Sequence, residues 1–339
     1  MPNLYPLLLR PEFHERVWGS RNLAPIYSGK IGDNPIGEAW LIGDACVAAN
    51  GPLAGRPLAS LSLEYGRRLL GEITSDALRF PLLIKYLFPQ GRLSVQVHPD
   101  DKAAARVGQP CGKTECWYVL EAGPGAQIGL GLKPGTTKVE VERAIRETTM
   151  EHLLNWIEIC PGDMFYVDGG TVHTIGGGSV ILETQQNSDT TYRLYDYGRA
   201  RALHVSEGLR AAKERTHAGK VAPSRERNEN GKEEVNLITS PSFVIDKFKV
   251  TQPWQFQRPL QGKRSVWCLV ATRGYGVIEG EGAPPVTVGP GEAVVVPAEV
   301  DWFILKPQWE LEFLCSSLPV EPVGHPVTIP AENAAAKAT

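Results

Sequence analysis

Four side chains that could bind a metal ion occur in three short segments of the chain. Gln96 and His98 lie in Leu-Ser-Val-Gln-Val-His-Pro, Glu115 in Gly-Lys-Thr-Glu, and His173 in Asp-Gly-Gly-Thr-Val-His. Alternate side chains of an extended strand share a face, so Gln96 and His98 point the same way. Two imidazoles, a carboxylate and an amide oxygen suit zinc or a similar divalent ion and leave room for water or substrate. The set therefore predicts a catalytic metal site rather than a structural one.

Single histidines in strands are more often structural, which is the simpler interpretation for any one histidine taken alone. Three features favour a metal role for His98 and His173: the face that Gln96 and His98 share, the strand pattern before each histidine, and Glu115 between them. Glu115 is followed by two aromatic residues, and a buried carboxylate needs a cation or a metal partner. The other histidines lack such neighbours and are expected to be structural: His14, His152, His204, His217 and His325.

Two basic residues lie close to these candidates. Lys113 precedes Glu115 by two positions and would share its face of a strand, where it could hold a phosphoryl oxygen or be a solvated loop lysine. Arg193 lies in a polar and aromatic stretch, residues 187–199, on the same face as Thr191 and Tyr195. It could stabilise an oxyanion or bind phosphate, or it could pair with a carboxylate for structural reasons. The residues alone leave both alternatives open.

The composition is that of an ordinary globular protein, with 339 residues of which 42% are apolar and 22% charged. This length allows about two domains. A formal charge of −3 gives no broad attraction to nucleic acid or membranes, so neither is expected as a partner. The six cysteines form no CxxC pair, the first residues lack a basic signal-peptide region, and no apolar run reaches the ~18 residues of a membrane span. We therefore expect a cytoplasmic protein with reduced thiols.

The hydrophobic pattern predicts a mainly β protein with a few short helices. Strands are expected over residues 80–86, 92–98, 115–121, 163–167, 179–184 and 190–197, and helices over residues 57–70 and 205–213. Two candidate capping boxes predict two further helices in succession: Thr137 with Glu140, and Thr148 with Glu151. The second of these helices would have Leu154 and Ile157 on its apolar face.

A charged stretch with almost no apolar residues, residues 213–234, is the best candidate for a linker. It would separate an N-terminal catalytic domain, residues 1–212, from a C-terminal domain, residues 235–318. Residues 319–339 are expected to form a tail that frays from about residue 326.

A weak internal repeat connects the two expected domains. Pro-Gly-Asp-Met-Phe-Tyr-Val at 161–167 matches Pro-Gly-Glu-Ala-Val-Val-Val at 290–296, an offset of 129 (290 − 161) that puts Trp302 where His173 stands. Upstream, residues 115–120 align with 265–270, so Ser265 would replace Glu115. The pattern predicts two jelly-roll barrels, the second degenerate and without metal ligands. Trp267 and Trp302 would fill its interior.

Several segments together resemble class I mannose-6-phosphate isomerase in its short bacterial form. The resemblance covers residues from about 5 to 318 in the expected order. It rests on His-Glu-Arg-Val-Trp-Gly at 14–19, Ile-Gly-Glu-Ala-Trp at 36–40, Pro-Leu-Leu-Ile-Lys at 81–85, Leu-Ser-Val-Gln-Val-His-Pro-Asp-Asp at 93–101, Gly-Lys-Thr-Glu-Cys-Trp-Tyr at 112–118, Gly-Thr-Val-His at 170–173 and Tyr-Arg-Leu-Tyr-Asp-Tyr at 192–197.

The resemblance implies the cupin fold and one catalytic zinc ion per chain. By motif, its ligands would be His98, Glu115 and His173, with Gln96 as the fourth ligand found in the longer relatives. The catalytic arginine of the family falls on Arg193. The implied reaction interconverts mannose 6-phosphate and fructose 6-phosphate by proton transfer through an enediol.

The phosphate of such a substrate would be oriented by Lys113 and by Arg199, and the chain would be a monomer or a weak homo-oligomer. Two other functions fit parts of the pattern. Two histidines and a carboxylate in a cupin could hold Fe(II) in an oxygenase. A non-catalytic sugar-phosphate-binding protein would need only the basic residues.

Overall fold

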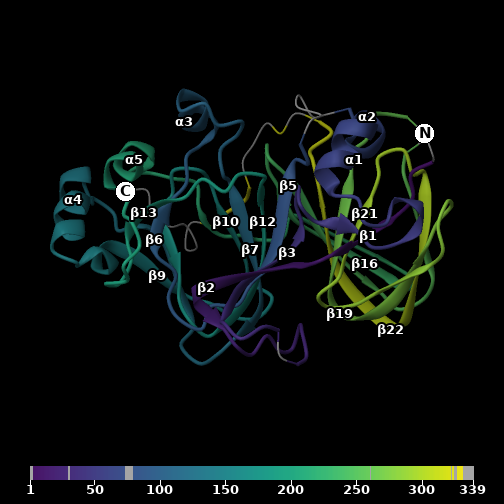
Figure 1. The fold of residues 1–339 in the computed structure, drawn as a ribbon, viewed down its shortest axis with the longest axis horizontal. Coiled ribbons are helices and arrows are strands. Elements are labelled where there is room, and N and C mark those ends of the chain that lie inside the picture. Colours follow the sequence, from purple (N-terminus) through teal and green to yellow (C-terminus); the bar gives the residue numbers. More distant parts are fainter. Residues whose placement is uncertain are drawn as a thin grey trace.

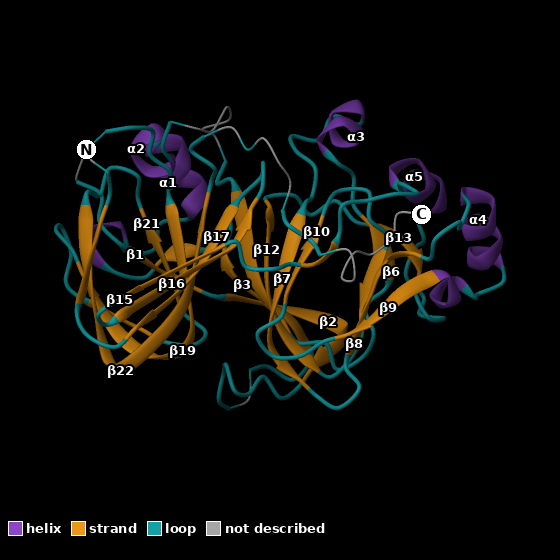
Figure 2. Cartoon of the chain, turned by 180° about the vertical axis from the view of Figure 1, so that it is seen from behind, coloured by secondary structure: helices purple, strands orange, loops and turns teal. Residues whose placement is uncertain are grey.

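Strands dominate the fold. The computed structural model describes residues 3–29, 31–72, 79–259, 261–321, 323 and 327–330. Every pairing between the strands of this part of the chain is antiparallel. The strands form three sheets, and the helices lie at the edges of the molecule (Figure 1 and Figure 2). The predicted mainly β fold with a few short helices is confirmed.

The largest sheet draws its strands from both ends of the chain. Its strands are β1 (Leu7–Arg10), β4 (Val47–Ala48), β15 (Arg225–Glu229), β16 (Lys232–Thr239), β17 (Val244–Val250), β18 (Trp254–Gln257), β19 (Trp267–Glu279), β20 (Val286–Val288), β21 (Ala293–Val296) and β22 (Trp302–Ser317). β1 pairs with β21 and with β4. Residues from the predicted N-terminal domain therefore complete a sheet that is built mainly from the last third of the chain.

The other two sheets contain the predicted site. The seven-stranded sheet has the order β14 (Gly219–Lys220), β10 (Met164–Val167), β7 (Glu115–Ala122), β12 (Ser179–Gln186), β5 (Leu82–Leu87), β3 (Ile36–Ile42) and β2 (Glu12–Ser20). The five-stranded sheet has the order β13 (Tyr192–Tyr195), β6 (Val95–Val97), β11 (His173–Ile175), β8 (Gln127–Leu132) and β9 (Leu154–Glu158). All six predicted strands are present, with ends shifted by a few residues.

The helices are short. They are α1 (Leu58–Tyr65), α2 (Arg67–Leu70), α3 (Asp101–Arg106), α4 (Lys138–Arg146) and α5 (Val205–Ala211), with 3-10 turns η1 (Gly51–Leu53) and η2 (Met150–Leu153). The helix predicted over residues 57–70 is divided at Gly66, whose positive φ of 48° interrupts the helical backbone. Among the described residues, no helix combines the length and apolar character that crossing a membrane requires.

One of the two predicted capping boxes is present. Thr137 and Glu140 cap the start of α4 reciprocally. The prediction of a second box at Thr148 was wrong, because Thr148 has a positive φ of 58° and only the turn η2 follows. The residues expected on a helical face form β9 instead, where Leu154 and Ile157 enter different hydrophobic clusters. Pairing with β8 outweighs the local helical signal.

The seven-stranded sheet is buried on both faces, because alternate residues of its strands enter different clusters. On β7, Trp117 and Val119 pack between the seven-stranded and five-stranded sheets, with Ile128 of β8 in the same cluster. Cys116 and Tyr118 point the other way, into a cluster shared with the ten-stranded sheet. β7 therefore has little freedom to shift its register.

In the ten-stranded sheet, too, alternate residues of one strand enter different hydrophobic clusters. Leu314 of β22 joins the cluster between the two large sheets, whereas Phe313 and Cys315 enter a cluster enclosed by the ten-stranded sheet itself. Residues of α1 and α2, among them Leu61 and Leu69, complete the shared cluster. This shared layer joins the N-terminal and C-terminal halves of the molecule (Figure 1).

The segment predicted to be a linker, residues 213–234, contains regular structure. It includes β14, which extends the seven-stranded sheet, and β15, which forms a hairpin with β16. All five residues of β15 are exposed. An edge strand that is solvated on both faces needs no apolar residues, and its charges discourage edge-to-edge association. Composition therefore indicated a linker where the structure has a charged edge strand.

Part of the segment expected to be a frayed tail packs against the protein. Val327 is buried, and its carbonyl oxygen accepts a hydrogen bond from His217 Nε2 at 2.6 Å. The amide of Ala222 donates to the carbonyl of Thr328. Residues 322, 324–326 and 331–339 of the predicted tail lie outside the described residues.

Strand pairing aligns the two parts of the internal repeat. Trp117 of β7 lies opposite Phe165 of β10, and Leu269 of β19 lies opposite Val294 of β21. Phe165 and Val294 differ by the predicted offset of 129 (294 − 165). On the neighbouring strands the offset is 152 (269 − 117), two residues more than the sequence alignment indicated. Leu269, and not Trp267, is therefore the counterpart of Trp117.

The corrected register changes the counterpart of the predicted metal carboxylate. Glu115 lies opposite Val167, and Trp267 lies opposite Val296. The sequence alignment had placed Ser265 at this position, but the structure places Trp267 there. An indole in the C-terminal half therefore occupies the strand position that carries a carboxylate in the N-terminal half.

Only one of the two tryptophans predicted to fill the C-terminal interior does so. Trp267 packs against the enclosed cluster and against Phe303. The buried guanidinium of Arg258 lies over its ring, 3.9 Å from the centroid, and donates to the Ser265 carbonyl at 2.6 Å. Trp302 is half-buried at the start of β22 and is not part of this cluster.

We expect the shared layer to control the stability of the whole chain. Leu314→Ala should lower the free energy of unfolding by about 2–5 kcal/mol, because it leaves a cavity between two sheets. Leu63→Ala is the matched control, since Leu63 is 64% exposed on α1. Urea denaturation followed by circular dichroism measures both. Equal losses for the two variants would contradict a packing role for Leu314.

Candidate metal centre

Backbone hydrogen bonds join the three segments that carry the predicted ligands. The amide of Gly170 donates to the carbonyl of His98 at 2.8 Å, and the amide of Lys113 donates to the carbonyl of Pro99 at 2.9 Å. The amide of Gly169 lies 3.4 Å from the hydroxyl of Thr114. The residues adjoining each candidate ligand are therefore fixed to one another by main-chain contacts.

Two glycines allow these segments to cross. A Cβ atom on Gly112 would lie 2.6 Å from the backbone of Asp100 and Asp101, and one on Gly169 would lie 2.6 Å from the Cα atom of Asp100. Backbone atoms cannot move aside as a flexible side chain can, so each position needs glycine. Asp100 also starts α3, which the sequence analysis did not predict, by accepting a hydrogen bond from the amide of Ala103.

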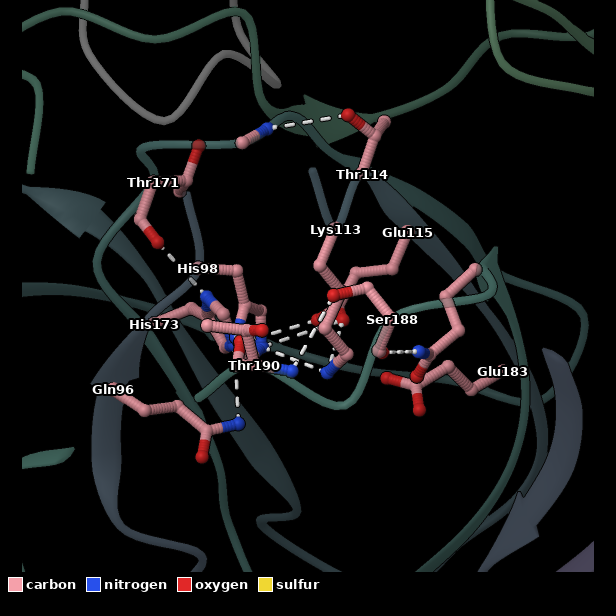
Figure 3. Close-up of polar contacts among 12 residues, drawn as sticks. Gln96, His98, Lys113, Thr114, Glu115, Thr171, His173, Glu183, Ser188 and Thr190 are labelled. Atoms are coloured by element: carbon pink, nitrogen blue, oxygen red, sulfur yellow. Dashed lines mark hydrogen bonds and ion pairs between the residues drawn. The ribbon is translucent and has the colours of Figure 1, made fainter. Parts of the chain in front are cut away.

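His98, Glu115 and His173 converge between the seven-stranded and five-stranded sheets (Figure 3). All three are buried, and their ligand-capable atoms lie within 4.8 Å of one another. Glu115 Oε2 lies 3.5 Å from His98 Nε2, and Glu115 Oε1 lies 3.3 Å from His173 Nε2. Neither carboxylate oxygen has a hydrogen bond of normal geometry. A buried anion facing two imidazole nitrogens is a donor set that fits a divalent cation.

Backbone carbonyls fix the orientation of both imidazoles. His98 Nδ1 lies 2.9 Å from the carbonyl oxygen of Thr190, and His173 Nδ1 lies 2.9 Å from that of Thr171. A carbonyl oxygen only accepts, so each Nδ1 carries the proton and each Nε2 presents a lone pair to the cluster. Such second contacts hold metal-binding histidines in the required tautomer.

Gln96 lies in the middle of a row of candidate residues. It is opposite His173 on one neighbouring strand and opposite Arg193 on the other. Its amide nitrogen is 3.3 Å from His173 Nε2, and its amide oxygen accepts a hydrogen bond from the Ser94 hydroxyl at 3.2 Å. Cross-strand neighbours share a face, so the row places an amide and a guanidinium beside the His98–Glu115–His173 cluster.

Lys113 is not the solvated loop lysine that one interpretation of the sequence allowed. It is buried, with its amino group 3.0 Å from Glu115 Oε2 and 2.9 Å from His98 Nε2. The Lys113 side chain and the His98–Glu115–His173 cluster point toward one another in Figure 3.

Burial shifts the pKa values of all three residues of the cluster. Burial, aided by repulsion from Glu183, raises the pKa of the Glu115 carboxyl to about 7. Burial also lowers the pKa of His173 to about 4, and burial with the nearby Lys113 lowers that of His98 well below its usual value. The imidazoles therefore stay neutral near pH 7, as metal ligation requires.

A cavity of about 300 Å³ opens beside the cluster, bordered by Gln96 and Lys113. Half of its lining residues are charged. They are the basic residues Arg16, Lys85, Lys113, Arg193 and Arg201 and the acidic residues Glu38, Glu183 and Asp189. The basic residues outnumber the acidic ones, which favours an anionic ligand.

One wall of the cavity is a buried ion-pair network centred on Lys85. Its amino group lies 2.8 Å from Glu183 and 3.9 Å from Glu38. Glu183 also accepts a hydrogen bond from Trp117 Nε1 at 2.9 Å, and Arg16 contacts Glu38 at 2.8 Å. Burial alone would raise the pKa of Glu38, but Lys85 and Arg16 hold it at about 2. This wall is therefore fully charged and strongly ordered.

Arg193 lies on the cavity, with Nη1 donating to the carbonyl of Ala202 at 2.8 Å. Its Nε is buried and has no hydrogen-bond partner. Arg199, however, does not line this cavity. Its guanidinium donates to Asp196 at 2.7 Å and to the carbonyl of Arg92 at 2.9 Å. Arg201 binds the same Asp196 carboxylate and does line the cavity.

The structure thus brings together Gln96, His98, Lys113, Glu115 and His173 and places Arg193 beside them. The sequence analysis gave no role to the other charged residues of the cavity: Arg16, Glu38, Lys85, Glu183, Asp189 and Arg201. Lys85 and Glu183 could have been noticed in the sequence, since each is the single charged residue of its strand. Such a charge is buried only when it is paired or functional.

Antiparallel sheets with a histidine and carboxylate cluster between them define a protein of the cupin class. Comparisons with known proteins narrow this class. The model of the type I phosphomannose isomerase catalytic domain matches residues 7–118. The chain is 38% identical over 265 residues to mannose-6-phosphate isomerase of Streptococcus mutans, covering 75% of this chain and 81% of that protein. It is 36% identical over 288 residues to ManA of Bacillus subtilis, covering 82% and 86%.

Solved structures agree with these relatives. The mannose 6-phosphate isomerase structure from Bacillus subtilis matches with a TM-score of 0.81 and 31% identity, over 91% of this chain and 99% of that one. A zinc-bound mannose 6-phosphate isomerase, 15% identical, shares the fold with a TM-score of 0.73 over 91% of this chain and 98% of its own. The chain belongs to the type I phosphomannose isomerase family.

The close crossing of the backbone at Asp100 is expected to control ion binding. Gly112→Ala should weaken divalent-ion binding by more than tenfold, because the added methyl group must push Glu115 away from the two histidines. Zinc titration of the apoprotein measures this effect. Gly91→Ala is the control, since its Cβ would meet only the Cα atom of Trp18 at 3.9 Å. Unchanged zinc affinity in a folded Gly112→Ala protein would contradict the proposed role of the crossing.

Proposed function

We propose that this chain is a zinc-dependent aldose–ketose isomerase that interconverts mannose 6-phosphate and fructose 6-phosphate through an enediol. The His98–Glu115–His173 cluster beside a cation-rich cavity carries the proposal. The two relatives with 38% and 36% identity are named for this activity. The cluster supplies the metal ligands of an isomerase, and the cavity supplies the charge that a sugar phosphate needs.

Zinc would be held by His98, Glu115 and His173, and Gln96 would be a further ligand once its amide turns to present the oxygen in place of the nitrogen. The three buried donors suit zinc, and a structural neighbour with the same fold is zinc-bound. When bound, the ion would act as a Lewis acid toward the two substrate oxygens that exchange roles. Lys113 would give up its present contacts with Glu115 and His98 and hold a substrate oxygen next to the ion.

Arg193 would stabilise the negative charge of the enediolate. Its Nε is a buried donor without a partner, so an anion in the cavity would satisfy it. The neighbouring basic side chains Arg16 and Lys85 are already engaged by Glu38 and Glu183. A half-buried guanidinium whose buried Nε meets charge as the reaction proceeds lowers the barrier rather than tightening ground-state binding.

Arg201 replaces Arg199 as the candidate for binding the phosphate. Both guanidinium groups contact the single carboxylate of Asp196, so the trio keeps one net positive charge. Only Arg201 presents that charge to the cavity. A phosphate bound there would fix the sugar and keep its reacting carbons near the metal centre.

The same proposal covers the domains, the cellular location, the oligomeric state and the partners of the chain. We infer that the catalytic centre belongs to an N-terminal domain and that the C-terminal part forms a second domain without metal ligands. A cytoplasmic location, a monomer or weak homo-oligomer, and the absence of nucleic-acid or membrane partners accord with a net charge of −3.

Metal removal tests the function directly. The purified chain should contain one zinc ion and convert mannose 6-phosphate to fructose 6-phosphate, and a chelator should abolish turnover until zinc is restored. His173→Ala should lose bound zinc and activity together. His152→Ala, a change at an exposed histidine, should lose neither. Full isomerase activity without metal, or oxygen-dependent turnover with bound iron, would overturn the proposal.

Arg193→Ala tests the charge-stabilising role. It should lower kcat on the order of 10²–10³-fold while zinc content stays at one ion per chain, because the guanidinium acts mainly on the transition state. Arg193→Lys should recover part of the rate. Arg210→Ala, at an exposed arginine of α5, is the control. Normal turnover by Arg193→Ala would leave Arg193 with only its structural contact to Ala202.

A further inference from the structure

A second cavity lies within the ten-stranded sheet, away from the metal centre. Its volume is about 390 Å³, within the range of roughly 300–1,000 Å³ that small-molecule sites occupy. The residues around it come from β16, β17, β18, β19 and β22, the strands of the C-terminal half in Figure 1. None of its lining residues has a part in the proposed isomerase reaction.

Strand register shows that this cavity is the counterpart of the catalytic one. Trp117 and Glu183 lie opposite each other and both line the first cavity. The corresponding pair on β19 and β22, Leu269 and Cys315, lie opposite each other and both line the second. Trp267, at the position of Glu115, also lines the second cavity. The same place in the repeated framework is therefore hollow in both halves, with different side chains around it.

Six aromatic residues line the second cavity. Phe248 stacks on Phe313 with centroids 5.1 Å apart, and Phe256 stacks on Phe303 at 5.0 Å. Trp254 and Trp267 are the other two aromatic residues of the lining. The stacked pairs hold the rings in place, and the half-buried Phe248, Trp254 and Trp267 offer a ligand rigid apolar surface.

The charged residues in the lining of the second cavity carry more negative than positive charge. Glu234 and Asp246 line it together with a single cation, Lys232. The Lys232 amino group is already engaged, 3.2 Å from Glu234 Oε2 and 4.9 Å from the centre of the Trp254 ring. The first cavity has more basic than acidic residues in its lining. A sugar phosphate that suits the first cavity therefore does not suit the second.

Asp246 has unused capacity to accept hydrogen bonds. One of its oxygens accepts from the Asn236 amide at 2.7 Å. Burial raises the pKa of this carboxyl to about 6, which shows that few donors compensate for its removal from water. A ligand with hydroxyl groups would supply the missing donors.

We propose that this second cavity binds an uncharged hexopyranose. Such a sugar has an apolar C–H face for the aromatic rings and a rim of hydroxyl groups for Glu234 and Asp246. A purely apolar ligand would leave two carboxylates desolvated without donors. A cationic ligand would meet Lys232, which already occupies the place over Trp254 that a cation prefers. The exposed amides of Gln255 and Gln257 at the same cavity offer further polar contacts.

The experiment is a titration of the full chain with D-mannose, followed by calorimetry and by saturation-transfer NMR. Glu234→Gln should weaken binding about tenfold or more, because it removes a charged acceptor of sugar hydroxyls. Glu233→Gln is the matched control, since Glu233 immediately precedes Glu234 on β16 and is exposed. His173→Ala, which removes a candidate zinc ligand beside the catalytic cavity, should bind mannose as the unchanged chain does, which separates the two sites.

A second variant shows whether loss of mannose binding results from misfolding. Ser317→Phe should fill the cavity and abolish mannose binding, while its melting temperature and isomerase activity show that the chain is folded. The proposal is overturned if mannose does not bind, or if Glu234→Gln and Ser317→Phe bind it normally. Preferential binding of tetramethylammonium over mannose would overturn the ligand class. Loss of mannose binding in His173→Ala would place the sugar in the catalytic cavity instead.

Discussion

The candidate metal centre depends on the crossing of three backbone segments at Pro99 and Asp100. His98 immediately precedes the crossing, and the segments of Glu115 and His173 reach it through Gly112 and Gly169. Main-chain hydrogen bonds fix the segments at a distance that leaves no space for a Cβ atom. Because each ligand lies within a few residues of this point, its position follows from backbone geometry rather than from adaptable side-chain packing. Catalytic groups need such rigid support.

The surrounding sheets convert this local crossing into a charged cavity. The seven-stranded sheet is buried on both faces, so its rows of side chains hold their register while carrying ionised groups toward the five-stranded sheet. Lys85 neutralises much of the charge of Glu38 and Glu183, which allows carboxylates to lie near Glu115 without preventing ion binding. Burial that would be costly for isolated charges is thus tolerated because they form a network.

The convergence of His98, Glu115 and His173 and most of the strands could be predicted from the sequence, because both rest on short motifs and local patterns. Alternation identified the shared face of Gln96 and His98, and the family motifs gave the order of the segments. The remainder depends on contacts between distant residues. Arg201 and Arg199 are two positions apart, and only tertiary packing decides which faces the cavity. Residues 154–158 carry a helical pattern but pair with β8, and β15 is a strand with no apolar residue to reveal it.

The two halves show how one strand framework can support different chemistry. At the register position of Glu115 the C-terminal half has Trp267, and the buried Arg258 beneath this ring satisfies backbone carbonyls. An indole cannot bind a divalent ion, but it can form the wall of a cavity. Leu269 and Cys315 likewise replace Trp117 and Glu183, which removes the carboxylate that Lys85 pairs with in the first half. The exchange of charged for apolar residues leaves the space open while reversing its charge preference, so the second cavity is better explained as a changed binding site than as a packing defect.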